Sequence, residues 1–246
     1  MEETQVYAAS CPDYSQAETC IRALVEQMGG MGRFVRPGER IVLKANLLRA
    51  APPESAICTH PAVVEAVAKL VKEAGGTPVI CDSPGGALHK EAVLRSLYEK
   101  TGMAAAAAAA GGGLSLGSST RTGSLPGGEG VRQAAIITPV AEADGVIDLC
   151  KMKTHVLMSM TGAVKNLFGV IPGLSKVGYH ATHPDHATFA DVLLDLTGYV
   201  KPRLSLMDGI LAMEGDGPGS SGTPRQGGLL LAAANPLALG TPPDVA

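Results

Sequence analysis

The strongest constraint on the fold is an alternation of short apolar runs with an amphipathic segment in the first half of the chain. Residues 40–44 carry the sequence Arg-Ile-Val-Leu-Lys, which predicts a strand. Pro61 then opens a segment whose apolar positions recur at three and four residues until the Gly-Gly pair at 75–76, which predicts a helix. A second apolar run at 78–81 ends at Asp82. This strand–helix–strand unit predicts parallel strands joined by a right-handed crossover.

The remainder of the chain continues this pattern, with one departure. We expect further strands at 5–9, 134–138, 145–150 and 203–207, and further helices at 17–28, 90–100, 104–110 and 185–200. Residues 111–130 are rich in Gly, Ser and Thr, which predicts a hairpin or a mobile insertion, and 208–228 is expected to be a loop. The predicted fold class is α/β, a mainly parallel sheet with helices on both faces and a Gly-rich insertion near 111–130, in a single domain over 1–246.

Composition excludes several classes of partner. A hydrophobic fraction of 46% with 17% charged residues is typical of a globular chain. The net charge of −3 and the lack of a basic tract interleaved with aromatics argue against nucleic acid as a partner. No signal-peptide pattern and no uninterrupted apolar run of about 18 residues appears, so we expect a cytoplasmic protein without a membrane partner. The five cysteines are scattered without a C-x-x-C pair, which argues against a metal cage made of thiols alone.

Cationic and imidazole side chains concentrate between residues 151 and 186. They are Lys151, Lys153, Lys165, Lys176, His155, His180, His183 and His186. Their neighbours are apolar residues and glycines rather than Asp and Glu, which is unusual for a solvated surface. Cations beside exposed backbone N–H groups suit an anionic ligand such as a carboxylate or a phosphate. We expect the lysines to neutralise this ligand and His155 to transfer a proton.

The three later histidines also have a spacing at which imidazoles can converge on a metal. His180, His183 and His186 are three residues apart, although Pro184 interrupts a continuous helix. We expect His180 and His183 as ligands of a divalent metal. The alternative for His186 is that it caps the following helix.

Polar residues at the ends of predicted strands are expected to join the same site. Lys44 and Asn46 end one strand, Asp82 ends another, and ligands in open α/β sheets bind outside the carboxyl ends of the strands. Each of the three has an alternative interpretation as a turn or cap residue. Asn166 follows Lys165 directly, and Glu214 lies between Met213 and Gly215 in a Gly-rich segment, so we include both as candidate binding residues.

Several of these segments resemble, in the same order, the blocks of the family catalogued as domain of unknown function 362. The matching stretches are 41–46, 59–61, 82–84, 151–155, 162–173 with Lys176 and His180, and 207–218. Members of that family often carry a ferredoxin-like module with two four-iron clusters. The resemblance therefore implies an iron–sulfur association, with 4Fe-4S clusters expected only if such a module is present in the full-length protein. The family usually continues past Leu239 with a long helix, so we expect this chain to be shortened at its C-terminus and to lack the module.

A more distant resemblance links residues 146–173 to nickel-pincer lactate racemases. In that family a His ten residues before a Lys acts as an acid/base, the Lys anchors a nickel-bearing pyridinium nucleotide, and a later His binds the metal. The resemblance implies these roles for His155, for Lys165, and for His180 or His183. Asp82 stands where the racemases have their other acid/base His.

Three functions remain open from the sequence. The first is an acid/base or redox enzyme that binds a small anionic substrate or a nucleotide-like cofactor through the lysines and histidines. The second is a non-catalytic scaffold that docks a ferredoxin-like electron-transfer module. The third is a module that binds a carboxylate metabolite without turnover.

Overall fold

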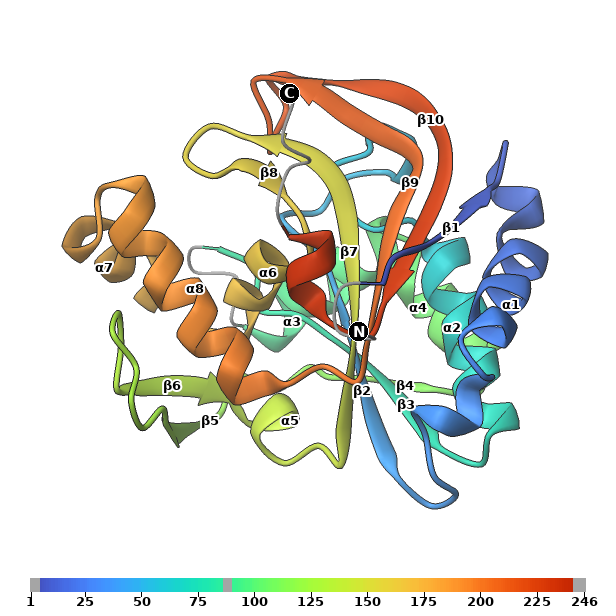
Figure 1. Cartoon of the computed structure of the whole chain (residues 1–246), viewed down its shortest axis with the longest axis horizontal. Coiled ribbons are helices and arrows are strands. Elements are labelled where there is room, and N and C mark those ends of the chain that lie inside the picture. Colours follow the sequence, from blue (N-terminus) through green and yellow to red (C-terminus); the bar gives the residue numbers. More distant parts are fainter. Residues whose placement is uncertain (1–4, 86–89, 241–246) are drawn as a thin grey trace.

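The computed structural model describes residues 5–85 and 90–240, and within them eight strands form one twisted sheet (Figure 1). Its order is β1 (Tyr7–Ser10), β10 (Gly222–Ala233), β9 (Leu204–Gly215), β7 (Gly145–His155), β2 (Arg40–Ala45), β3 (Thr77–Cys81) and β4 (Gly113–Leu114), and β8 (Ser159–Thr161) pairs with the end of β7. The strands from β9 to β4 are parallel, whereas β1, β10 and β8 pair antiparallel. The expected α/β fold with a mainly parallel sheet is confirmed.

Helices cover both faces of the sheet, as expected. On one face lie α1 (Ala17–Gln27), α2 (Pro61–Glu73), α3 (Glu91–Lys100) and α4 (Met103–Ala109); on the other lie α5 (Thr138–Ala141), α6 (Ala163–Asn166), α7 (Ser175–Thr182) and α8 (His186–Val200) (Figure 1). The apolar spacing of α2 buries Val63, Val67 and Val71 against the sheet, and Pro61 stands in its first turn, where no intrahelical N–H bond is lost. The side chain of Asp185 caps α8 by accepting from the Thr188 N–H.

Alternation along the central strands decides which side chains reach which face. In β2, Ile41 and Leu43 belong to the core under α1 and α2, whereas Val42 belongs to the core under α8. Because successive side chains of a strand point to opposite faces, Lys44 lies on the α8 side. Register places Lys44 opposite Asp148 of β7. Two buried ionisable groups therefore meet on the α8 face at the carboxyl end of the parallel strands.

Two segments differ from the sequence-based expectation. Residues 208–228 were expected to form a loop, but most of them belong to the long antiparallel pair β9–β10, with a register shift between Gln226 and Leu229. Gly227 and Gly228 lie at this register shift, where a bulge tolerates glycine without ending the strand. In the Gly-rich segment, the hairpin is confirmed: β5 (Thr120–Ser124) pairs with β6 (Gln133–Ile137) in a separate two-stranded sheet.

Among the described residues, no helix combines the length and the apolar character needed to cross a bilayer. Residues 241–246, where the sequence departs from the blocks of the resembled family, lie outside the part of the chain that the structure describes.

Candidate functional site

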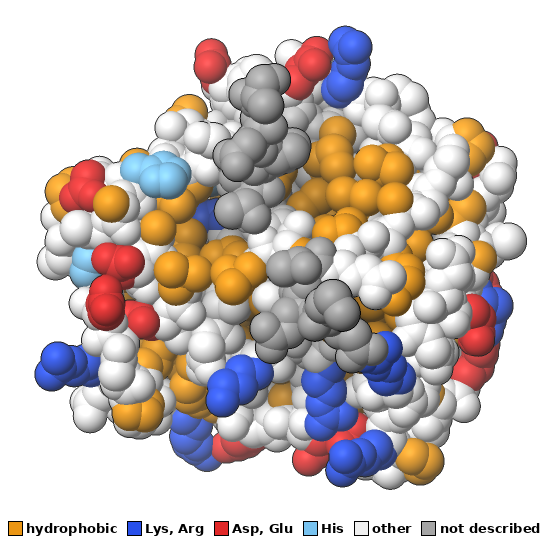
Figure 2. Space-filling view, in the orientation of Figure 1, with side chains coloured by type: hydrophobic (Ala, Val, Ile, Leu, Met, Phe, Trp, Pro, Cys, Tyr) orange, Lys and Arg blue, Asp and Glu red, His pale blue; other side chains and the backbone are white. Residues whose placement is uncertain are grey.

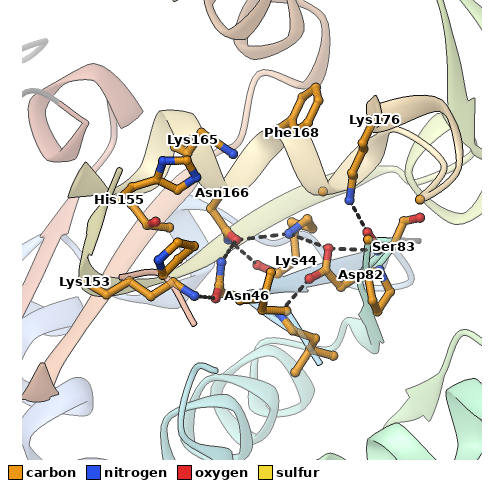
Figure 3. Close-up of a pocket in the computed structure, with 18 of the residues that line it drawn as sticks. Lys44, Asn46, Asp82, Ser83, Lys153, His155, Lys165, Asn166, Phe168 and Lys176 are labelled. Atoms are coloured by element: carbon orange, nitrogen blue, oxygen red, sulfur yellow. Dashed lines mark hydrogen bonds and ion pairs between the residues drawn. The ribbon is translucent and has the colours of Figure 1, made fainter. Parts of the chain in front are cut away.

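A cavity of about 290 Å³ opens at the carboxyl ends of β2, β3 and β7, beneath α6 and α7. Its lining consists of Lys44, Asn46, Leu47, Leu48, Asp82, Ser83, Pro84, Gly85, Lys153, His155, Thr161, Lys165, Asn166, Phe168, Gly169, Gly173, Lys176, Val177, His180 and Pro218. The structure thus brings together nine of the twelve side chains that the sequence suggested for binding, catalysis or metal ligation, from five separate segments of chain. Eight of them are labelled in Figure 3: Lys44, Asn46, Asp82, Lys153, His155, Lys165, Asn166 and Lys176. His180 is the ninth, and it lies on α7 at the same cavity.

The floor of the cavity is a buried ion pair between Lys44 and Asp82. Lys44 Nζ lies 2.8 Å from Asp82 Oδ1, and the side chains are 0% and 6% exposed. The other carboxylate oxygen accepts the Leu47 N–H at 2.6 Å, and Oδ1 also accepts the Ser83 N–H at 2.8 Å. Gly169 passes directly over this pair, and a Cβ there would collide with Asp82 Oδ1 and Lys44 Nζ. Only glycine lets the backbone approach this closely.

Asn166 connects the ion pair to its neighbours by four hydrogen bonds. Its Oδ1 accepts from Lys44 Nζ at 3.2 Å and from Asn46 Nδ2 at 2.9 Å. Its Nδ2 donates to Asp148 Oδ1 at 2.7 Å and to the Lys44 carbonyl at 3.2 Å. Asn46 in turn accepts from Lys153 Nζ at 2.8 Å. The network fixes the positions of the lysines before any ligand arrives, which is the preorganisation that a polar site needs.

Three lysines of the lining have no carboxylate partner among the described residues. Lys153 donates to the neutral Asn46 side chain and to the Ile57 carbonyl, and Lys176 donates to the Ser83 carbonyl. The Lys165 amino group has no hydrogen bond or ion pair to the described residues and lies over the rings of Phe168 and Phe189, 4.9 and 5.6 Å from their centroids. Within the described lining, Asp82 carries the sole carboxylate, and Lys44 already neutralises it. The cavity therefore has a surplus of positive charge.

Burial of these lysines, and their closeness to one another, lowers their pKa values. Burial, together with Lys176, Lys153 and Lys44, lowers the pKa of Lys165 to about 7. Burial lowers the pKa of Lys153 and of Lys176 to about 8 in each case. Figure 2 shows a small area of basic side chain between hydrophobic and histidine side chains on the left of that face. These shifts lower the protonated fraction of the three lysines, and a bound anion would raise it.

His155 presents a fixed tautomer to the cavity. Its Nδ1 accepts the backbone N–H groups of Leu157 at 3.1 Å and Met158 at 3.3 Å, so this nitrogen carries no proton and Nε2 does. Burial and the charge of Lys165 lower the pKa of His155 to about 3, which keeps the ring neutral. The geometry therefore favours His155 as an N–H donor to a ligand oxygen over the proton-transfer role that the sequence suggested.

The three later histidines do not converge on a metal. His180 lies on α7, with its ring stacked on Phe189 at a centroid distance of 4.6 Å. His183 ends α7, where its Nδ1 lies 2.9 Å from the Thr182 hydroxyl, and His186 begins α8 at the exposed surface. The three-residue spacing does not bring these histidines together, because α7 ends before Pro184 and α8 starts in another direction. Among the described residues, no group of three or more His, Cys, Asp or Glu could hold a metal ion.

Lys151 and Glu214 do not line the cavity. Lys151 shares the parity of Ile147 and Leu149 in β7 and points to the opposite face of the sheet. There its Nζ lies 2.7 Å from Asp208 Oδ2 in an ion pair with both side chains 0% exposed. Glu214 lies on β9, exposed to solvent, and pairs with Arg225 at 3.5 Å.

Sequence reasoning missed two residues of this site. Phe168 contacts three cationic or imidazole groups of the cavity, those of Lys165, Lys176 and His180. Asp148 is buried beneath Asn166, and burial raises its pKa to about 7. A charged residue in the middle of the apolar run 145–150 was the signal that could have identified Asp148, because such residues are rarely buried without a partner.

Comparison with solved structures supports the fold assignment. The lactate racemase apoprotein from Thermoanaerobacterium thermosaccharolyticum superposes with a TM-score of 0.55 at 14% sequence identity, over 95% of this chain and 55% of that one. At this level of identity the similarity concerns the fold alone.

Comparison of sequences identifies the family. The chain is 38% identical to the thylakoid-associated protein sll1697 of Synechocystis sp. over 225 residues, which are 89% of this chain and 66% of that protein. The chain thus spans slightly less than two thirds of this relative's length. The family model described as domain of unknown function (DUF362) matches residues 41–241, a range that includes every residue of the cavity lining. This protein therefore belongs to the DUF362 family, within a fold related to that of lactate racemase.

Proposed function

We propose that the protein binds a small anionic molecule, a carboxylate or a phosphate-bearing cofactor, in the cavity under α6 and α7. The observation that carries this proposal is the surplus of cations: Lys153, Lys165 and Lys176 face one space without a carboxylate partner among the described residues. A folded chain that had only to be stable would pair or expose such groups, because burying an uncompensated charge costs free energy. An anion is the ligand that removes this cost.

Two neutral donors support the same proposal. His155 offers Nε2–H to an oxygen of the ligand, because its Nδ1 accepts two backbone N–H groups. Thr161 lines the cavity, and its buried hydroxyl has no hydrogen-bond partner among the described residues. Buried polar atoms without partners are rare in folded proteins, and a ligand in the cavity is one way to satisfy them.

The residues that would hold a nickel-bearing pyridinium nucleotide, as in the resembled racemases, are also present. Lys165 has a free amino group and His180 an imidazole at the same cavity, which fit an anchor and a single metal ligand. The pyridinium ring of such a group accepts and returns a hydride. The acid/base pair of the racemases is incomplete here, because Asp82 holds Lys44 and two backbone N–H groups with its carboxylate. We therefore propose binding of an anion, rather than racemisation, as the function.

Replacing Lys165 by Ala should abolish binding of a small anion without unfolding the protein. The Lys165 amino group has no partner to lose, so its removal leaves the network around Asn166 intact. The measurement is isothermal titration with phosphate and with propionate, together with the thermal midpoint of each variant. Lys201→Ala, which removes an exposed lysine outside the lining, is the matched control. Equal affinities in the wild type and in Lys165→Ala would contradict the proposal.

Affinity for a plain anion should fall by about tenfold between pH 7 and pH 8, because the pKa of Lys165 is near 7 and those of Lys153 and Lys176 are near 8.

The free energy of unfolding of the ligand-free protein should rise over the same pH range. The unfolded lysines keep their protons up to about pH 10, so over this window the unfolded state binds more protons and the free energy of unfolding rises by about 1 kcal/mol. Urea unfolding at both pH values, kept below about pH 8.5, where unfolded cysteines ionise, measures this. A flat or falling stability would contradict the lysine assignments.

A further inference from the structure

We propose that Lys165 captures a small carboxylate that also carries an aldehyde or ketone group, by forming an imine with its carbonyl carbon. The proposal rests on the proposed function and names the chemical class of ligand for the same cavity. It begins from the one lysine of the lining whose amino group is free of any hydrogen bond or ion pair to the described residues.

The surroundings of Lys165 favour an uncharged, reactive amine. Two aromatic rings, Phe168 and Phe189, cover its amino group, and the cations of Lys176, Lys153 and Lys44 surround it. An amine that is desolvated or placed beside other cations loses its proton more easily, and the uncharged form is the nucleophile. At neutral pH the pKa of about 7 leaves both forms populated, so the ammonium form can bind a plain anion while the amine form can attack a carbonyl.

Other groups of the cavity match the remaining parts of such a ligand. Lys153 and Lys176 remain mostly protonated at neutral pH and have only neutral acceptors, so either can hold the carboxylate. The Nε2–H group of His155 is an uncharged donor for the carbonyl oxygen. A donor at this oxygen polarises the carbonyl toward attack, as in oxyanion sites. A volume of about 290 Å³ limits the ligand to a small molecule.

The proposed step balances without an additional reactant. The Lys165 nitrogen lone pair forms a bond to the carbonyl carbon, and one proton moves from this nitrogen to the carbonyl oxygen to give a carbinolamine. This intermediate loses its hydroxyl group with one proton as water, and the carbon–nitrogen double bond remains. The reverse reaction with water releases the ligand, so the capture is reversible and involves no change of oxidation state.

Reductive trapping tests the proposal. The full chain is incubated with glyoxylate or pyruvate and sodium cyanoborohydride at about pH 7, and intact mass and peptide mapping then locate any adduct. We expect one adduct per chain, on Lys165, formed roughly 10–100-fold faster than on exposed lysines such as Lys90, Lys100 and Lys201. Phosphate in excess should protect Lys165, and trapping should accelerate from pH 6 to pH 8 while the affinity for propionate falls.

Two variants make the result specific. Lys165→Arg keeps a cation but cannot form an imine under these conditions, so it should lose the adduct, whereas Lys201→Arg should keep it. Adducts spread equally over surface lysines, unchanged in Lys165→Arg, would overturn the imine proposal. If the wild type binds propionate by calorimetry but forms no adduct on Lys165, the imine proposal fails and anion binding stands. If neither propionate nor phosphate binds, both proposals fail.

Discussion

Lys151→Met is expected to lower the free energy of unfolding by about 3–5 kcal/mol and to leave anion affinity unchanged. Lys151 is fully buried, its Nζ lies 2.7 Å from Asp208 Oδ2 and 3.0 Å from the Tyr14 hydroxyl, and it does not line the cavity. Methionine keeps the volume of the side chain but leaves the Asp208 carboxylate without its cation. Urea unfolding and titration with phosphate measure the two quantities separately.

A second substitution distinguishes a lost charge pair from lost packing. In Lys151→Met/Asp208→Asn no uncompensated charge remains, so part of the lost stability should return, and the non-additivity is the coupling energy of the pair. Lys201→Met, at an exposed position, should change stability by no more than about 0.5 kcal/mol. Full stability in Lys151→Met with loss of phosphate binding would show instead that Lys151 acts in the ligand site.

Lys151 also shows where sequence reasoning reached its limit. The apolar run 145–150 predicted a strand and correctly placed the following residues at the carboxyl end of the sheet. It did not predict that β7 continues to His155, with a register shift between Lys151 and Lys153. Proximity in sequence to Lys153 suggested a shared site, but Lys151 pairs with Asp208 and Tyr14 away from the cavity, whereas Lys153 reaches Asn46 in its lining.

The parts of the site that could be predicted are those fixed by local pattern. Lys44 and Asp82 follow apolar strands of a recognisable strand–helix–strand unit, so their meeting at one edge follows from the topology. The position of α7 could not be predicted, because this short helix has no buried residue and no strong apolar pattern of its own. It is held by contacts with residues distant in sequence, such as the hydrogen bond from the Lys176 amino group to the Ser83 carbonyl. Long-range packing of this kind leaves no periodic signal in the chain.

The ion pair beneath the cavity leads to the second large effect. Asp82→Asn should lower the free energy of unfolding by about 3–5 kcal/mol, because Lys44 is fully buried and loses its carboxylate partner. The amide also fits the site poorly: Oδ1 of Asp82 accepts from Lys44 and Ser83, and Oδ2 accepts from Leu47. Whichever way an asparagine is turned, its NH₂ group faces a donor.

The same variant tests the link between the charge of the cavity and its ligand. Without the Asp82 carboxylate the lining carries one more uncompensated cation, so a bound anion neutralises more charge than in the wild type. Added phosphate should therefore recover more stability in Asp82→Asn than in the wild type, measured by urea unfolding against sodium chloride of equal ionic strength. Asp216→Asn, at an exposed position, is the control and should respond as the wild type does. Equal stabilisation of all three proteins by phosphate would mean that the anion binds away from Lys44, and the cavity would then not be the anion site.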